Sequence, residues 1–233
     1  MSRRNKLKKF SQLFEFPNAF QHMDYHDNFV IGNGQKYTMS DRKWFRDYFK
    51  NGHPIILELG CGRGEYSIAM AERYPEKNFI GIDIKGARLW KGVKDALDFG
   101  LTNVVFLRTR VEKIADFFDP EEISEIWVTF PDPYPERAKR RLTSPLFLNL
   151  YRQILKTDGL LHLKTDNHSL FQYSKGVLNK NKDFQIIIDT EDITELEEKI
   201  PDLKIRTTYE KKHREENAIT YLKARKIIET PIN

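Results

Sequence analysis

The feature that most constrains the fold is the regular alternation of short apolar runs with helical patterns from residue 55 onward. We expect strands at residues 55–59, 78–82, 104–107, 125–130, 160–164, 184–189 and 218–226. We expect helical segments at residues 40–49, 65–73, 85–99, 111–118, 145–156, 168–179 and 192–199. This alternation predicts an α/β fold with a doubly wound, mostly parallel seven-stranded sheet that has helices on both faces. Ligands of such sheets bind beyond the carboxyl ends of the strands.

Length and composition narrow the possible classes. The 233 residues suit one domain, which we place at 36–233, after a basic and aromatic N-terminal arm at 1–35. The single cysteine, Cys61, excludes an internal disulfide framework, and the scattered histidines show no metal-ligand spacing, so no metal is expected. No apolar run reaches membrane-spanning length, and no apolar segment follows the basic N-terminus. The expectation is a cytoplasmic protein without a membrane partner.

Positive charge is concentrated in three short segments. The chain carries a formal net charge of +5, and the cations gather at residues 1–9, 137–141 and 211–214. Clusters of this kind are typical of surfaces that bind nucleic acid, although any one of them alone is also compatible with a solvated face or tail. Together they favour a phosphate-rich partner.

A glycine-rich loop follows the first expected strand of the alternating region. Gly60, Gly62 and Gly64 permit a tight turn and close backbone approach to a ligand. Their spacing differs from the dinucleotide fingerprint and from a phosphate-binding loop with Gly-Lys-Ser/Thr, which argues against a nicotinamide-dependent oxidoreductase. Glu58 precedes the loop, and Asp83 ends the next strand, where a carboxylate can bind ribose hydroxyls.

The stretch after the fourth expected strand has an unusual composition. Its sequence, Phe-Pro-Asp-Pro-Tyr-Pro, runs from residue 130 to residue 135 and places Asp132 and Tyr134 between prolines. A run of cations follows at 137–141. An ordinary turn would explain the prolines but not the cations. We name residues 130–136 the reactive turn.

Two families share these motifs. The glycine loop with Glu58 and Asp83 resembles the first two motifs of the class I S-adenosylmethionine-dependent methyltransferases. The reactive turn, the basic run, Lys-Thr-Asp-Asn at 164–167 and Thr-Thr-Tyr-Glu at 207–210 together resemble the bacterial tRNA (guanine-N7-)-methyltransferase family, over about residues 40–226. This resemblance implies a Rossmann-like fold, S-adenosyl-L-methionine as cofactor, tRNA as partner, and methyl transfer to N7 of a guanine in the variable loop.

The same resemblance implies roles for individual residues. Asp132 matches the catalytic acid, which also borders the cofactor. The expected cofactor-binding set is Glu58, Gly60, Gly62, Gly64, Asp83, Arg110, Glu112 and Asp132. The expected substrate-binding set is Glu136, Arg137, Lys139, Arg140, Arg141, Asp166, Thr207, Thr208, Tyr209 and Glu210.

Two positions depart from the family pattern. Arg110 stands where members usually have an Asp near the adenine. We therefore expect the adenine contact to come from backbone groups or from Glu112. Glu136 stands where many members have a substrate-contacting Lys.

Several alternatives stay open at this level. Asp132 or Asp166 is expected to stabilise the positive charge that the purine gains, or Asp132 to act as a general base. Tyr134 or Tyr209 either stacks on the exposed base or packs half-buried. The functional alternatives are a methyltransferase for another RNA or a protein amide, and a non-catalytic RNA-binding protein. The oligomeric state, monomer or homodimer, is left open.

Overall fold

The computed structural model describes residues 3–39, 43–213 and 218–227. The chain divides into two compact units, residues 1–119 and 120–233. Unit 1 carries the glycine loop, and unit 2 carries the reactive turn and the basic run that follows it.

The centre of unit 1 is a parallel sheet of three buried strands. They are β4 (Ile55–Leu59), β5 (Asn78–Ile82) and β6 (Val104–Arg108). β5 lies between the other two, with Leu57 opposite Ile80 and Ile80 opposite Val105. The continuous apolar runs of these strands are buried in the core, as expected for parallel strands.

Helices connect the strands of unit 1 and pack on its sheet. α3 (Glu65–Arg73) contacts β4 and β5, and α4 (Gly86–Asp98) contacts β6. Gly100 follows α4 with a φ of 68°, the left-handed conformation in which a glycine commonly ends a helix. The 3-10 helix η2 (Val111–Asp116) occupies most of the stretch 111–118, for which the sequence predicts a short helix.

The first 38 residues contain elements that the sequence pattern does not predict. α1 (Arg3–Gln12) packs on α4, and β1 (Ala19–Gln21) pairs in parallel with β6. The antiparallel strands β2 (Phe29–Gly32) and β3 (Gln35–Thr38) extend the same sheet. The sheet prediction of seven strands is therefore too low, because ten strands are present in the described residues. Residues 40–42 of the next expected helix lie outside the described residues, and the rest of it forms α2 (Lys43–Phe49).

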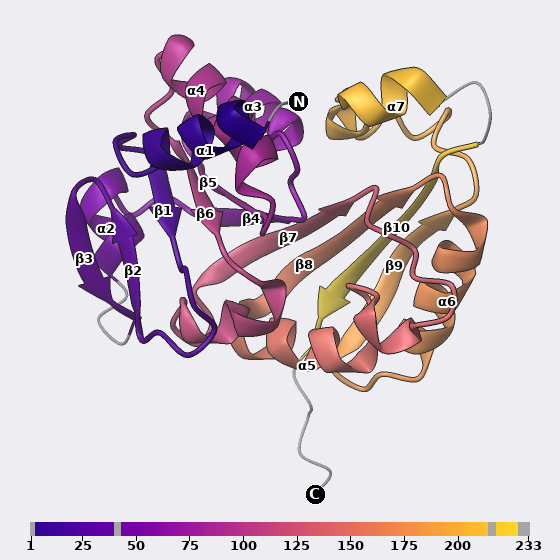
Figure 1. Cartoon of the computed structure of the whole chain (residues 1–233). Helices are drawn as coiled ribbons and strands as arrows, with labels where there is room; N and C mark the ends of the chain where they lie inside the picture. The colour runs from indigo at the N-terminus through magenta and orange to yellow at the C-terminus, as the bar shows by residue number, and fades with distance from the viewer. Residues whose placement is uncertain (1–2, 40–42, 214–217, 228–233) are drawn as a thin grey trace, which may run out of the picture. The chain divides into compact units, whose positions relative to one another are not determined.

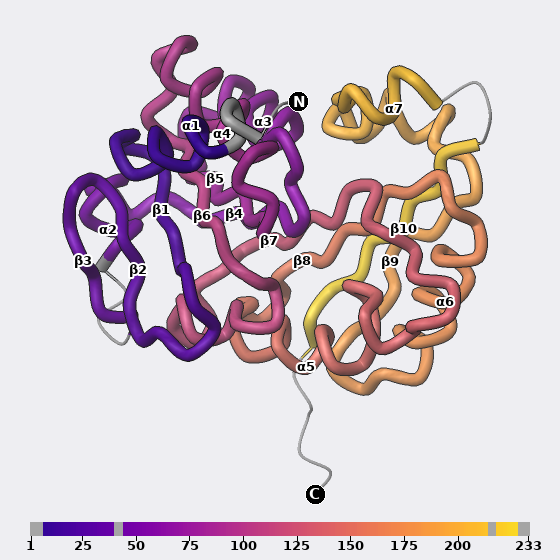
Figure 2. Tube along the Cα trace, viewed as in Figure 1, coloured from indigo at the N-terminus to yellow at the C-terminus, as the bar shows by residue number. Residues whose placement is uncertain are grey.

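Unit 2 is built on four strands in the order β7-β8-β10-β9. They are β7 (Ile123–Thr129), β8 (Leu155–Thr165), β9 (Phe184–Thr190) and β10 (Thr220–Lys226). β7 and β8 are parallel, and β10 is antiparallel to both of its neighbours. Figures 1 and 2 show β8 and β10 side by side although they are far apart in the sequence.

The elements of unit 2 follow the sequence prediction in two places and depart from it in two. α5 (Pro145–Ile154) and α6 (His168–Asn179) lie where the sequence predicts them. β8 begins early, at Leu155, because its pairing with β7 shifts register between Ile123 and Glu125 and accommodates the extra residues. The prediction of a helix at 192–199 is wrong: this stretch consists of turns, which begin where Asp192 Oδ1 accepts hydrogen bonds from Thr194 N and Oγ1. Two short helices come next, the 3-10 helix η4 (Pro201–Lys204) and α7 (Thr208–His213).

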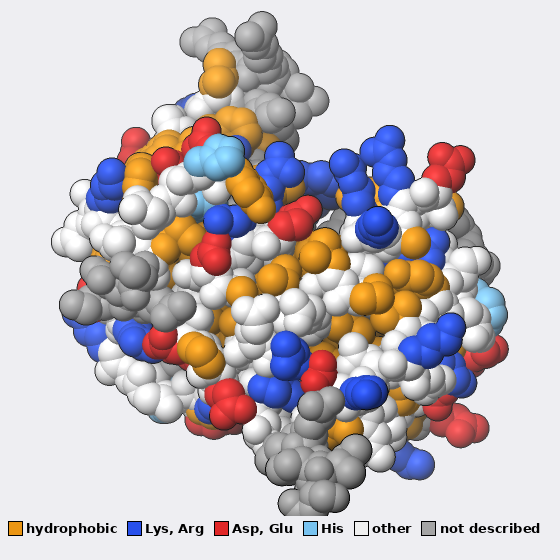
Figure 3. All heavy atoms as spheres, turned by 90° about the horizontal axis from the view of Figure 1, so that it is seen from below, with side chains coloured by type: hydrophobic (Ala, Val, Ile, Leu, Met, Phe, Trp, Pro, Cys, Tyr) orange, Lys and Arg blue, Asp and Glu red, His pale blue; other side chains and the backbone are white. Residues whose placement is uncertain are grey.

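The surface carries charges of both signs. On the face that Figure 3 shows, the Lys and Arg side chains of the described residues are interspersed with acidic and apolar side chains. No helix within the described residues is both long and apolar enough to cross a membrane. The basic run at 137–141, in which no acidic residue occurs, is thus a local feature of the chain.

Candidate active site

The glycine loop of unit 1 connects the end of β4 to the start of α3. Gly60, Gly62 and Gly64 all have positive φ, at 73°, 58° and 69°. The N–H groups of Gly60 and Cys61 donate to Ile82 O, over 2.8 and 3.0 Å, which fastens the loop to the end of β5. The sequence therefore folds here as a tight turn from β4 into α3, held against the end of the neighbouring strand β5.

Two of these glycines serve different purposes. A Cβ at Gly64 would lie 2.3 Å from a carbon of the Phe106 ring, so close packing excludes any side chain there. A Cβ at Gly62 would meet nothing within 4 Å, so the backbone at Gly62 faces open space. Such an exposed backbone allows a ligand to approach closely.

The carboxylates of Glu58 and Asp83 are the anchored acids of unit 1. Glu58 is 5% exposed, and its Oε2 accepts hydrogen bonds from Ser67 N at 2.9 Å and Ser67 Oγ at 2.5 Å. Asp83 is 8% exposed; its Oδ2 accepts from Gly62 N at 2.9 Å and its Oδ1 from Lys85 N at 2.6 Å. A carboxylate oxygen can accept about two hydrogen bonds, so Asp83 keeps capacity for further donors.

The cysteine of the loop lies close to these acids. Burial, reinforced by the nearby negative charges of Glu58 and Asp83, raises the pKa of the Cys61 thiol well above its ordinary value. The thiol is thus held neutral, and Cys61 acts as a small apolar side chain under the loop.

Three residues at the ends of β5 and β6 are exposed. Arg110 caps η2 in an extended conformation, and Glu112 lies in the first turn of η2. Ile84, directly after Asp83, is 45% exposed. The predicted cofactor-binding set does not include Ile84, although an apolar residue beside an acid that is expected to bind ribose is a signal that could have indicated it.

The reactive turn of unit 2 has a strained backbone. Phe130 and Tyr134 have φ values of 46° and 39°, a region that residues other than glycine rarely occupy. Asp132 is exposed, and Tyr134 Oη lies 3.4 Å from its Oδ2. Strain of this kind is concentrated at functional sites, which supports a functional role for this turn.

The basic run after the turn is folded rather than extended. It contains the 3-10 helix η3 (Ala138–Arg140), and Ser144 Oγ donates to Lys139 O at 3.1 Å. The side chains of Glu136, Arg137, Lys139 and Arg140 are exposed. Arg141 differs, because its guanidinium donates to main-chain oxygens of the reactive turn.

A second acidic position lies at the end of β8. Asp166 accepts a hydrogen bond from Tyr209 Oη at 2.9 Å. Tyr209 is 48% exposed, and its ring centroid lies 5.5 Å from that of Phe130. Thr207 Oγ1 accepts a hydrogen bond from Glu210 N at 3.1 Å, and both Thr207 and Thr208 are partly exposed. The structure therefore brings the reactive turn and two of the expected substrate motifs together within unit 2.

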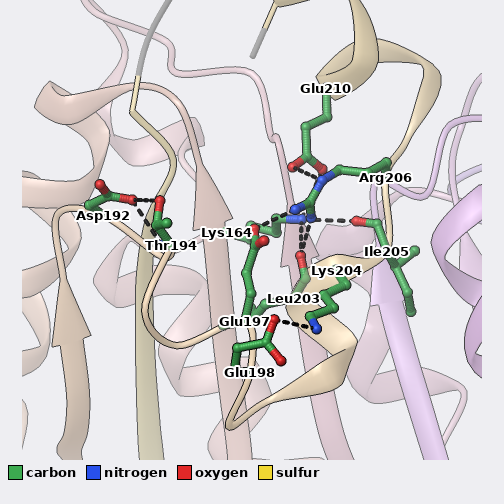
Figure 4. A network of polar contacts seen from close by, with 10 residues as sticks. All are labelled: Lys164, Asp192, Thr194, Glu197, Glu198, Leu203, Lys204, Ile205, Arg206 and Glu210. Carbon is green, nitrogen blue, oxygen red and sulfur yellow. Dashed lines mark hydrogen bonds and ion pairs between the residues drawn. The ribbon is translucent and has the colours of Figure 1, made fainter. Parts of the chain in front are cut away.

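Glu210 has a different environment from the other expected substrate residues. Its side chain is fully buried, and its Oε2 lies 2.8 Å from Lys164 Nζ (Figure 4). Lys164 Nζ also donates to Leu203 O and Ile205 O at 3.0 and 2.9 Å, which uses all three of its protons. Burial lowers the pKa of Lys164 to about 8, against the opposing effect of Glu210.

An arginine completes this network. Arg206 Nε lies 3.3 Å from Glu210 Oε1, and the Arg206 guanidinium also pairs with Glu197 and donates to Leu203 O (Figure 4). The network fastens the segment 197–210 to β8. Glu210 thereby holds the segment that carries Tyr209, and its assignment to the substrate-binding set stays a prediction.

Among the described residues, no group of three or more His, Cys, Asp or Glu side chains could hold a metal ion.

Comparison with known proteins agrees with these features. Residues 52–222 match the model of a family described as putative methyltransferase. The chain is 43% identical over 229 residues to the tRNA (guanine-N(7)-)-methyltransferase of Christiangramia forsetii, covering 96% of this chain and 98% of that protein.

Solved structures show the same fold. The 16S rRNA methyltransferase KamB superposes with a TM-score of 0.59 at 15% identity, over 79% of this chain and 93% of that chain. A second structure is a variant of the 16S rRNA (adenine(1408)-N(1))-methyltransferase of Catenulisporales acidiphilia, solved with the cosubstrate SAM. It superposes with a TM-score of 0.53 at 14% identity, over 83% of this chain and 94% of that chain. The sequence match over nearly the whole of both chains shows that this chain belongs to the tRNA (guanine-N7-)-methyltransferase family.

Proposed function

We propose that this chain transfers the methyl group of S-adenosyl-L-methionine to N7 of a guanine in the variable loop of tRNA. The observation that carries the proposal is the 43% identity to a tRNA (guanine-N(7)-)-methyltransferase over almost the full length of both proteins. The chemistry of the two units supports it independently.

The residues of unit 1 fit the cofactor. The open backbone at Gly62 admits the methionine part, and the remaining acceptor capacity of Asp83 suits ribose hydroxyls. The exposed side chain of Ile84 offers an apolar surface to the adenine, with Arg110 and Glu112 at the next strand end. Glu58, which Ser67 anchors, places negative charge under the loop, where it favours the cationic amine and sulfonium. When bound, the cofactor supplies an activated methyl group.

The residues of unit 2 fit a guanine and the RNA around it. Asp132 and Asp166 offer carboxylates to the purine, and the half-exposed Tyr209 offers a stacking face. Arg137, Lys139 and Arg140 are placed in an exposed, folded segment next to the reactive turn, where they suit phosphates.

The reaction requires little acid–base chemistry from the protein. Guanine N7 carries an in-plane lone pair, so the main task is to align it with the methyl group. Orientation of this kind contributes several kcal/mol, up to roughly 7 to 11 in the best cases. The purine gains positive charge as the bond forms, and the carboxylate of Asp132 stabilises that charge electrostatically. The proposal requires the ligands of unit 1 and unit 2 to meet during turnover.

The direct test is incubation of the protein with a labelled methyl donor and unmodified tRNA, followed by mapping of the labelled nucleoside. We expect label in N7-methylguanosine of the variable loop. Label in another nucleoside or in a protein amide would favour a different substrate class. Tight tRNA binding without any label transfer, combined with no cofactor binding by calorimetry, would favour a non-catalytic RNA-binding protein.

A further inference from the structure

The last arginine of the basic run is bonded to the reactive turn. Arg141 Nε donates to Pro133 O at 2.9 Å and lies 3.3 Å from Tyr134 O, and its Nη2 lies 3.3 Å from Pro135 O. Its guanidinium carbon lies 4.3 Å from the ring centroid of Tyr173 on α6. One side chain therefore binds three consecutive carbonyls of the turn while it stacks on a helix of the same unit.

The turn needs such support because its own backbone supplies little. Pro131, Pro133 and Pro135 have no N–H to donate, and Phe130 and Tyr134 both have positive φ. Each residue in such a conformation costs on the order of 1–3 kcal/mol, and it persists only where the surroundings determine it. The Arg141 guanidinium adds a side-chain contact to each of the three carbonyls directly after Asp132.

The neighbouring cations are arranged differently. The side chains of Arg137, Lys139 and Arg140 make no hydrogen bond or ion pair with any other described residue, and all three are exposed. Arg141 is only partly exposed and directs at least two of its nitrogens at the turn. Four similar cations in five residues therefore divide into three that face solvent and one that faces the protein.

We propose that Arg141 is a positioning residue, which fixes the reactive turn and thereby Asp132, and that it does not serve as a tRNA phosphate contact. This inference rests on the proposed function, because it assigns Arg141 a task in that reaction. Lysine cannot replace it, since a single ammonium lacks the planar fork that reaches carbonyls on both sides and stacks on a ring.

The test compares variants of the full-length chain. Arg141→Lys keeps the charge and removes the fork, Arg141→Ala removes both, and Tyr173→Leu removes the ring beneath the guanidinium. Arg152→Lys on α5, whose side chain contacts Asn149 and Asp183, is the matched control for the exchange of arginine for lysine. Arg140→Ala is the comparison for loss of an exposed cation.

The first measurement is hydrogen exchange on the free protein, which does not depend on catalysis. Arg137 N donates to Tyr134 O at 3.1 Å, and Phe130 N donates to Lys164 O at 2.8 Å, so these amides report on the turn. We expect faster exchange at both in Arg141→Lys, Arg141→Ala and Tyr173→Leu, with unchanged exchange along β8 and in Arg152→Lys. Unchanged exchange at the turn in all three variants would overturn the proposal, even if one of them lost activity by misfolding.

The second measurement separates kcat from KM and follows tRNA affinity against salt. We expect Arg141→Lys and Arg141→Ala to lower kcat roughly 10- to 100-fold, the loss typical of a misplaced catalytic group, with the KM values for tRNA and cofactor unchanged. The slope of log Kd against log salt should stay the same in both, whereas Arg140→Ala should reduce it by roughly 0.7 to 0.9. A reduced slope with unchanged kcat in Arg141→Ala would show a phosphate contact and overturn the inference. If the wild-type chain transfers no methyl group to tRNA, the proposed function fails, while the exchange data still decide whether Arg141 holds the turn.

Discussion

The acidic residues of the two units differ in how they are held. In unit 1, Glu58 and Asp83 are 5% and 8% exposed, and each accepts two hydrogen bonds from nearby N–H or O–H groups. In unit 2, Asp132 is exposed and Asp166 is partly so, and the hydroxyls of Tyr134 and Tyr209 lie against them. The same side-chain chemistry therefore occurs once in a rigid, enclosed setting and once in an open one.

The difference matches the sizes of the two proposed ligands. A small cofactor can be enclosed, so anchoring its acids before it arrives reduces the ordering cost of binding. A guanine inside a folded tRNA must be exposed before it can enter, and only open carboxylates and aromatic faces can receive it. In unit 2 the exposed side chains are held by contacts beneath them. The Arg141 guanidinium binds the reactive turn, and the buried network of Lys164, Glu210 and Arg206 holds the segment that carries Tyr209.

The largest effect is expected at the exposed acid of the reactive turn. Asp132→Ala should lower the single-turnover rate by roughly 10²- to 10³-fold, because it removes electrostatic stabilisation of the purine charge. Affinity for tRNA should be nearly unchanged, since Asp132 adds no attraction to phosphates. The measurement is a rapid-quench methylation assay at saturating tRNA and cofactor, with tRNA binding measured separately. Near-normal turnover would remove Asp132 from the mechanism.

The next effect concerns the buried layer of unit 2. Lys164→Met should lower the free energy of unfolding by about 3 kcal/mol, because it leaves the buried Glu210 carboxylate without its shortest partner. This value is at the lower end of the range usual for breaking a buried ion pair, because Arg206 still contacts Glu210. Denaturant titration gives the value. Lys175→Met is the control, since Lys175 pairs with Asp189 at the surface and its loss should change stability little. Equal effects of the two substitutions would contradict the structural role of the network.

A smaller effect is expected at the enclosed acid of unit 1. Asp83→Asn should weaken the binding of S-adenosylhomocysteine by about 10- to 100-fold, as expected for the loss of a charged acceptor of ribose hydroxyls. Calorimetry measures it. Asp95→Asn on α4, where Asp95 pairs with Lys91 at the surface, is the control and should bind normally. An equally large loss of tRNA affinity in Asp83→Asn would contradict the assignment of cofactor binding to unit 1 and of tRNA binding to unit 2.

The last effect is a pH dependence of stability. Burial lowers the pKa of Lys164 to about 8, while the unfolded chain keeps the ordinary value of 10.5. Between these values the folded protein binds fewer protons than the unfolded chain, so Lys164 makes the free energy of unfolding rise with pH across this window. The wild-type chain should therefore gain stability relative to Lys164→Met between pH 8 and pH 10.5. A difference that stays constant or shrinks would show that the pKa of Lys164 is not lowered.

Much of the architecture could be predicted, because long apolar strands and amphipathic helices carry strong periodicity. The bounds of β4, β5, α3 and α6 agree with the prediction at both ends. The strands β1, β2 and β3 were missed because three or four residues show too few repeats of a pattern.

The site could be predicted by residue type but not by orientation. Arg140 and Arg141 are adjacent and chemically identical, yet one faces solvent and the other binds the reactive turn. Glu210 lies in a motif together with the exposed Tyr209, yet it is buried against Lys164, 46 residues away in the sequence. Which way a charged side chain points depends on tertiary contacts that spacing alone does not encode.

The most direct measurement is a crystal structure of the chain with S-adenosylhomocysteine and an unmodified tRNA. We expect the cofactor product on the Gly60–Gly64 loop, with its ribose hydroxyls on Asp83. We also expect the target guanine beside Asp132, with N7 directed at the sulfur. A cofactor product bound away from the loop, or a guanine N7 remote from Asp132, would contradict the proposed mechanism.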